Sequence, residues 1–132
     1  MTIIVGYRPT PEGTAALERA IDEADRSDAP LLIVHSAERP TEESRAVSLE
    51  RGADALSERL AARGVAHEIK QLDLDANPAE MILAGVTDPS ADLIVIGLRR
   101  RSPVGKIISG SVAQQVLLEA PCAVLAVKAH SG

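Results

Sequence analysis

Short apolar runs alternate along the chain with longer segments in which apolar residues recur every three or four positions. Runs rich in Val, Ile and Leu are typical of strands that are covered on both faces. They predict strands at Ile3–Val5, Leu31–Val34, Asp92–Gly97 and Ala123–Val127. His67–Leu72 has alternating character and predicts one more strand.

The longer segments predict helices between these strands. Thr10 suits an N-cap and Pro11 the first helical position, and the apolar residues up to Ala24 fall on one helical face. A charged and Ala-rich segment predicts a second helix over 42–63, which Gly64 ends. Two further helices are predicted at 77–86, capped by Asn77, and at 111–118.

The alternation of strands and helices predicts an α/β fold. We expect an open five-stranded parallel sheet, doubly wound with helices on both faces, as a single domain over residues 1–132. Ligands of such sheets bind outside the carboxyl ends of the strands, near the point where the strand order reverses. The loops after the first, second and fourth strands are therefore the places to look for a site.

Composition excludes several functions. Tyr7 is the only aromatic residue and the formal net charge is −5, which disfavours a nucleic acid partner. The chain has no apolar run long enough to span a membrane and no signal peptide, so we expect no membrane partner. The single cysteine, Cys122, agrees with a reducing compartment and predicts a cytoplasmic protein.

The loop after the fourth strand has a composition that suits an anion. Gly97 ends the strand and permits a close backbone approach, and the Gly110-Ser111 pair would offer free N–H groups at a helix start. Three consecutive arginines, Arg99 to Arg101, lie between them. Gly is also an ordinary turn residue, so a purely structural role for Gly97 and Gly110 stays open.

The order of elements, this loop and the segment from Gly110 to Val116 followed by Ala120-Pro121-Cys122 resemble the universal stress protein family. The resemblance covers nearly the whole chain. It implies the fold described as adenine nucleotide alpha hydrolase-like, a stress-response or signalling role, and ATP or AMP, with Mg²⁺, as a ligand of some members.

The family's ATP-binding pattern is a Gly, two residues, a second Gly, nine residues, and then Gly-Ser or Gly-Thr. Gly97, Gly110 and Ser111 match it, whereas Arg100 occupies the second Gly position. Arg8 stands where the family tends to carry an Asp near the ribose and base.

Two interpretations of these departures remain. The arginines block a degraded site, or they bind phosphate through guanidinium groups, with Gly105 restoring flexibility nearby. The resemblance implies nucleotide-site residues that include the backbone of Ser36 beside an adenine ring. The candidate set is Arg8, Ser36, Gly97, Arg99, Arg100, Gly105, Gly110, Ser111 and Val112.

The remaining reactive side chains indicate no catalytic or metal site. No nucleophile is paired with an oriented base, and the histidines have no metal-type spacing. His35 ends the second strand and is expected to be a hydrogen-bonded strand-end histidine that faces the site. Cys122 is expected to point into the core as a small apolar residue.

Three functions fit these observations. The first is a non-catalytic stress-response or signalling module, with an unknown protein partner and adenine nucleotide as a regulator. The others are a slow ATPase and an interaction protein with a vestigial nucleotide site. The last strand is apolar and predicts a homodimer that uses Ala123, Val124, Leu125, Ala126 and Val127, as the family resemblance also implies.

Overall fold

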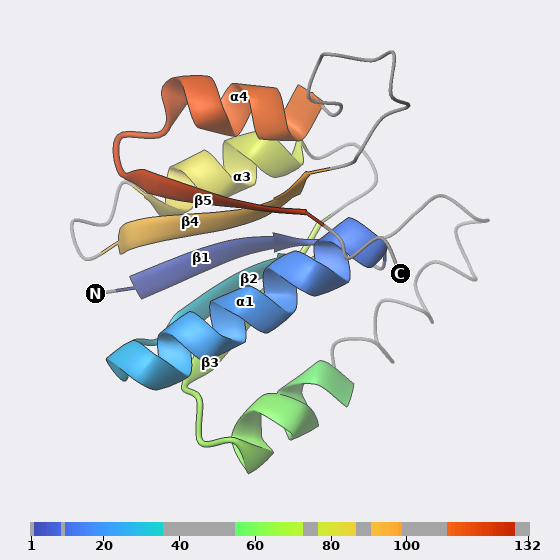
Figure 1. Cartoon of the computed structure of the whole chain (residues 1–132), viewed down its shortest axis with the longest axis vertical. Coiled ribbons are helices and arrows are strands. Elements are labelled where there is room, and N and C mark those ends of the chain that lie inside the picture. The colour runs from blue at the N-terminus through green and yellow to red at the C-terminus, as the bar shows by residue number, and fades with distance from the viewer. Residues whose placement is uncertain are drawn as a thin grey trace.

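A parallel sheet forms the centre of the molecule, with helices on both of its faces (Figure 1). The computed structural model describes residues 2–8, 10–35, 55–72, 77–86, 91–98 and 111–128. The strands are β1 (Thr2–Tyr7), β2 (Leu31–His35), β3 (His67–Gln71), β4 (Ala91–Leu98) and β5 (Ala123–Lys128). The helices are α1 (Pro11–Ser27), α3 (Pro78–Gly85) and α4 (Ser111–Glu119), with a further helical segment at 55–62.

The strand order is β3-β2-β1-β4-β5, and every neighbouring pair is parallel. The chain builds one half of the sheet outward from β1 and then returns to β4 on its other side. The predicted five-stranded parallel α/β fold is thus confirmed. The predicted helix over 42–63 is described only at 55–62, and the rest of it lies outside the described residues.

Local sequence signals fix where α1 and α3 begin. The Thr10 hydroxyl accepts a hydrogen bond from the Gly13 backbone N–H at 3.1 Å, and Pro11 occupies the first turn of α1. The Asn77 side chain accepts one from the Ala79 N–H at 2.9 Å at the start of α3. The N-caps expected from the sequence are therefore present.

Alternation along the strands divides the apolar residues between two cores. Ile3 and Val5 of β1 face α1 and the 55–62 segment, whereas Ile4 faces α3 and α4. α1 packs on the sheet through the buried residues of one face, among them Ala16, Leu17, Ala20 and Ile21. Because both faces of the sheet are covered, the central strands consist mostly of apolar residues.

The two edges of the sheet differ in character. β3 exposes polar side chains, Glu68, Lys70 and Gln71. β5 exposes Ala123 and Lys128 only at its ends, and its middle residues are half-buried apolar side chains. One edge is therefore polar, and the other is apolar.

No helix in the described part of the chain is both long and apolar enough to cross a membrane.

Candidate functional site

The carboxyl ends of β1 and β4 lie side by side at the point where the strand order reverses. The connection after β1 leads to α1 on one face, and the helix that precedes β5, α4, lies on the other face (Figure 1). Because α1 and α4 cover opposite faces of the sheet, a crevice is expected at this position. The candidate residues Arg8, Gly97 and Ser111 belong to the segments that bound this position.

Arg8 follows β1 directly and its side chain is exposed. Its backbone carbonyl accepts a hydrogen bond from the Thr10 N–H at 2.8 Å, which forms the tight turn into α1. The α-carbon of Gly13 packs against the same peptide unit, and a Cβ there would lie 2.9 Å from the Arg8 carbonyl carbon. The backbone of Arg8 is therefore held by the turn, and its side chain is exposed at the carboxyl edge.

Gly97 lies beneath the first turn of α1. A Cβ at this position would lie 2.7 Å from the carbonyl carbon of Glu12, which is closer than packed atoms approach. Close approach at Gly97 was expected from the sequence, and the partner that the structure places there is protein backbone. Packing of α1 on β4 thus already accounts for the glycine. A role of Gly97 toward phosphate stays a prediction.

α4 begins at Ser111, as predicted from the sequence. The first turn of α4 contains no acidic residue, so nothing in that turn opposes the positive end of the helix dipole. Val112 is half-buried and packs against the core beneath α3 and α4. The helix start therefore suits an anion, whereas the Val112 side chain serves the core.

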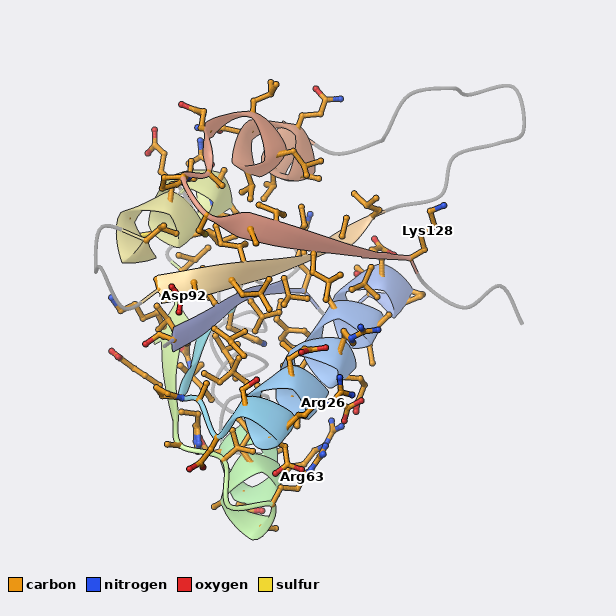
Figure 2. All side chains as sticks on the ribbon, turned by 60° about the vertical axis from the view of Figure 1, so that its left-hand side comes forward. Arg26, Arg63, Asp92 and Lys128 are labelled. Atoms are coloured by element: carbon orange, nitrogen blue, oxygen red, sulfur yellow. The ribbon has the colours of Figure 1, made fainter. Side chains whose placement is uncertain are left out.

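Lys128 is a basic residue at this edge that the sequence analysis did not single out. It ends β5, pairs in register with Leu98 and is exposed (Figure 2). The sequence signal that could have identified Lys128 is its position directly after the last predicted strand. Arg8 and Lys128 give the carboxyl edge two exposed cations, and Glu12 in the first turn of α1 contributes one acidic side chain nearby.

The remaining candidate residues cannot be placed. Those outside the described residues are Ser36, Arg99, Arg100, Gly105 and Gly110. Ser111 is described as the first residue of α4 and not by its side chain. Of the candidate nucleotide-site set, the structure describes the surroundings of Arg8, Gly97 and Val112.

His35 ends β2 and stacks loosely on Tyr7, which ends β1 in the same register. Their ring centroids are 5.1 Å apart, with the planes inclined by 35°. His35 is only 4% exposed, and its Nδ1 atom has no hydrogen-bond partner among the described residues. The expectation of a hydrogen-bonded strand-end histidine is thus not met at this atom. Sequence reasoning missed the pairing with Tyr7, although both residues end their strands.

Burial lowers the pKa of His35, because the charged imidazolium loses hydration in the core. The ring is therefore neutral at pH 7. One of its nitrogens then donates a hydrogen bond and the other accepts one.

Cys122 lies away from this edge. Burial, followed by the negative charge of Asp92 at the start of β4, raises the pKa of the thiol. Asp92 and Lys128 mark opposite ends of the sheet (Figure 2). Cys122 is partly buried and packs against the core beneath α3 and α4, as expected. Within the described ranges, no group of three or more His, Cys, Asp or Glu side chains could hold a metal ion.

Comparison with known proteins identifies the family. The family model described as "Universal stress protein family" matches residues 1–128. A protein of Mycolicibacterium smegmatis named "Universal stress protein" is 40% identical over 97% of this chain and 98% of its own length.

Solved structures of the family have the same fold. A universal stress protein from Archaeoglobus fulgidus is 30% identical, covers 97% of this chain and 98% of its own, and superposes with a TM-score of 0.71. Another from the same organism, solved in complex with dAMP, is 24% identical over 97% of this chain and 98% of its own, also with a TM-score of 0.71. The chain matches the family model across its fold and a curated relative over nearly its whole length, and therefore belongs to the universal stress protein family.

Proposed function

We propose that this chain is a non-catalytic stress-response or signalling module, a single universal stress protein domain whose activity responds to adenine nucleotide. The observation that carries the proposal is the composition of the carboxyl edge at β1 and β4. Exposed Arg8 and Lys128 and the acid-free start of α4 all belong to this edge. Basic side chains and a helix start without an acidic residue in its first turn favour a phosphorylated ligand.

The ligand class is suggested by a relative. A universal stress protein from Archaeoglobus fulgidus with the same fold was solved in complex with dAMP. In this chain we propose AMP or ATP, with Mg²⁺ accompanying ATP. Arg8 and Arg100 would then contribute charge-assisted hydrogen bonds to phosphate, where the family pattern has an Asp and a Gly.

The absence of catalysis is proposed from the side chains near the edge. Where the structure describes this edge, no nucleophile is paired with a general base, and Arg8 stands where the family tends to carry an Asp. A slow ATPase is the second candidate, since Gly97, Gly110 and Ser111 of the ATP-binding pattern are retained. A vestigial site on an interaction protein is the third, because Arg8 and Arg100 could exclude the ligand.

Copurified nucleotide tests the proposal directly. The protein is purified without added nucleotide, extracted with acid, and the extract is separated by ion-exchange chromatography with detection at a nucleotide wavelength. Because the chain has no Trp and one Tyr, protein carry-over contributes little absorbance. We expect AMP, ADP or ATP in the extract. No nucleotide there, and none retained after incubation with AMP and rapid desalting, would favour the vestigial site.

An assay of phosphate release distinguishes the proposed non-catalytic module from a slow ATPase. The pure protein is incubated with ATP and Mg²⁺, and inorganic phosphate is followed over hours. We expect release at the rate of the buffer alone. Release that scales with protein concentration and persists through a second purification would overturn the non-catalytic assignment.

We further propose a homodimer through Ala123–Val127 of β5. The support is the difference between the two sheet edges: β3 carries exposed Glu68 and Lys70, and charged edge strands resist pairing. β5 has half-buried apolar side chains, and exposed Leu118 lies on the adjacent α4. Multi-angle light scattering across micromolar concentrations should give twice the chain mass. A monomer throughout that range would contradict the dimer.

A nucleotide-responsive module of this kind would act in the cytoplasm. Adenine nucleotides are held there, and the reducing conditions would leave the single thiol of Cys122 unpaired.

A further inference from the structure

A hydroxyl and an imidazole are paired where the helical segment at 55–62 meets the start of β3. The Oγ atom of Ser57 lies 3.3 Å from Nε2 of His67. The other ring nitrogen, Nδ1, lies 2.9 Å from the backbone carbonyl oxygen of Val65. From the sequence we expected no nucleophile beside an oriented base, and this pair corrects that expectation. Ser57 and His67 are ten positions apart, so no local motif reveals their contact.

The turn at Gly64 brings the two side chains together. The Gly64 N–H donates to the Ala61 carbonyl at 3.1 Å, and the Val65 N–H donates to the Leu60 carbonyl at 3.0 Å. Gly64 has a φ of 72°, a left-handed conformation that glycine adopts without a steric penalty. The chain then enters β3 at His67, and the imidazole lies back against the helical segment that it has just left.

The Val65 carbonyl determines which ring nitrogen of His67 is the base. A carbonyl oxygen only accepts hydrogen bonds, so in the neutral ring Nδ1 carries the proton and donates it. Nε2 then has a lone pair that accepts the hydrogen bond of the Ser57 hydroxyl. A nucleophile in reach of a base that a third group orients is the arrangement of an activated hydroxyl, and 3.3 Å falls in the looser range found before a reactant binds.

The position of the pair leaves it accessible and separate from the proposed nucleotide site. Side chains alternate along a strand, so His67 lies on the same face of β3 as Ile69, which packs against the core beneath α1. Ser57 and His67 are both half-buried, and each therefore keeps some exposed surface. They lie at the amino end of β3, whereas the proposed nucleotide site lies at the carboxyl ends of β1 and β4.

We propose that Ser57 is a self-acylation site, which takes the acyl group of a small activated carboxylic ester with His67 as the general base. As Oγ bonds to the carbonyl carbon of the ester, the hydroxyl proton passes to Nε2. The bond from that carbon to the leaving oxygen then breaks, and the leaving oxygen takes the proton from Nε2. The products are a Ser57 ester and a free alcohol or phenol. One transfer per chain suffices, so the proposal is compatible with a module that does not turn over a substrate.

The first test compares two serines in the unaltered protein. The full chain is incubated with p-nitrophenyl acetate, and the acetylation of each serine is followed by peptide mass spectrometry. Ser27 is the internal control, because it is exposed at the end of α1, a helix without histidine. We expect Ser57 to be acetylated about a hundredfold faster than Ser27, as general-base assistance implies, although Ser57 is the less exposed of the two. Equal rates at the two serines would overturn the inference.

The second test removes the base. His67→Gln replaces the imidazole by an uncharged amide, and we expect the acetylation rate of Ser57 to fall to about that of Ser27. Ser57→Ala is the matched control, which should abolish the fast release of p-nitrophenol and leave labelling of Ser27 unchanged. A Ser57 rate that is the same in His67→Gln and in the unaltered protein would contradict the role of His67.

A third measurement serves if His67→Gln fails to fold, which thermal unfolding detects. In the unaltered protein, the Ser57 rate is recorded against pH, and the titration of the His67 imidazole is followed by NMR in the same buffers. We expect the two curves to have the same midpoint, because only the neutral imidazole accepts the proton. A Ser57 rate that ignores this titration would assign the pair a purely structural role. No nucleotide is present in these experiments, so their failure would leave the proposed nucleotide function unchanged.

Discussion

A Cβ added at Gly6 of β1 would meet different atoms from a Cβ added at Gly97 of the neighbouring strand β4. A Cβ at Gly97 would meet the backbone of Glu12, whereas a Cβ at Gly6 would meet the end of the Ile82 side chain, 2.7 Å from its Cδ1. A side chain can rotate away, but the first turn of α1 is fixed by its Thr10 cap. The glycine pattern around a site can therefore arise from packing alone.

This difference predicts an order of stability. We expect Gly97→Ala to lower the free energy of unfolding by about 1–3 kcal/mol, because α1 must move off β4. Gly6→Ala should have a smaller effect. Urea denaturation monitored by circular dichroism measures both. Equal stabilities of Gly97→Ala and the unaltered protein would mean that α1 does not depend on the close contact with β4.

His35 predicts how stability depends on pH. Burial lowers the pKa of the His35 imidazole in the folded state, whereas in the unfolded chain the same imidazole has a pKa of about 6.5. Below that pH the unfolded state binds more protons, so the His35 contribution is present above about pH 6.5 and declines as the pH falls toward the folded pKa.

The expected slope is at most about 1.4 kcal/mol per pH unit. We expect the difference in unfolding free energy between the unaltered protein and His35→Leu to decrease from about pH 7.5 to pH 5.5. Taking the difference between the two unfolding free energies cancels the contributions of the other titrating groups. A difference that is constant over this range would mean that the His35 imidazole titrates alike in both states.

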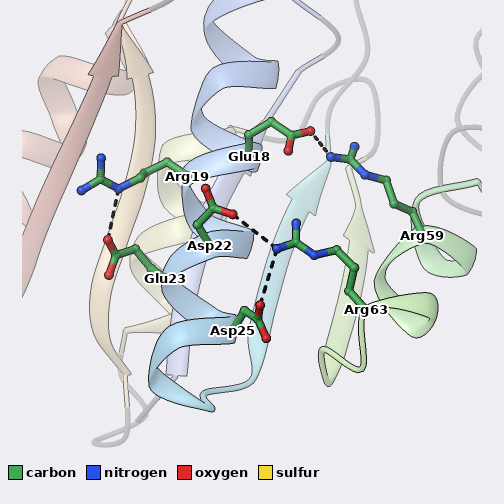
Figure 3. Close-up of polar contacts among 7 residues, drawn as sticks. All are labelled: Glu18, Arg19, Asp22, Glu23, Asp25, Arg59 and Arg63. Atoms are coloured by element: carbon green, nitrogen blue, oxygen red, sulfur yellow. Dashed lines mark hydrogen bonds and ion pairs between the residues drawn. The ribbon is translucent and has the colours of Figure 1, made fainter.

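At the scale of elements, the helical segment at 55–62 and the turn that follows it are attached to α1 by two kinds of contact. Leu60 is fully buried in the core beneath α1. On the surface, Arg59 pairs with Glu18, and the Arg63 guanidinium lies 3.3 Å from Asp22 (Figure 3). The apolar contact should dominate, because exposed ion pairs contribute little.

Substitutions of Leu60 and Arg63 distinguish the contribution of the apolar contact from that of the exposed ion pairs. We expect Leu60→Ala to lower the free energy of unfolding by about 2–5 kcal/mol and Arg63→Ala by less than about 1 kcal/mol. The effect of Arg63→Ala should shrink further in about 1 M NaCl, where exposed charges are screened. A larger loss of unfolding free energy in Arg63→Ala than in Leu60→Ala would mean that the ion pairs, and not the apolar contact, hold this segment on α1.

Sequence reasoning recovered the elements better than their contacts. The strands at Ile3–Val5 and Ala123–Val127 and the cap at Thr10 follow from local signals, and the structure contains them. The contact between Gly97 and Glu12 joins residues far apart in the chain, and no local pattern encodes it. The missing partner of His35 Nδ1 likewise depends on what surrounds the ring in three dimensions.

At the scale of the whole molecule, the proposed response to nucleotide depends on a few residues of the family's ATP-binding pattern. Gly97, Gly110 and Ser111 retain the family pattern, and Arg8 and Arg100 depart from it. The arginines act as phosphate ligands in our proposal and as an obstacle in its alternative. These two roles predict opposite effects when the Arg100 side chain is removed.

The most direct measurement is calorimetric titration of AMP and ATP into dialysed protein, side by side with Arg100→Gly. Our account predicts binding in the micromolar range by the unaltered protein and weaker binding by Arg100→Gly, because a charge-assisted phosphate contact is lost. No binding by the unaltered protein would contradict the account. Binding gained in Arg100→Gly would then identify a blocked site, and no binding in either would leave the surface and the β5 edge as the sites of function.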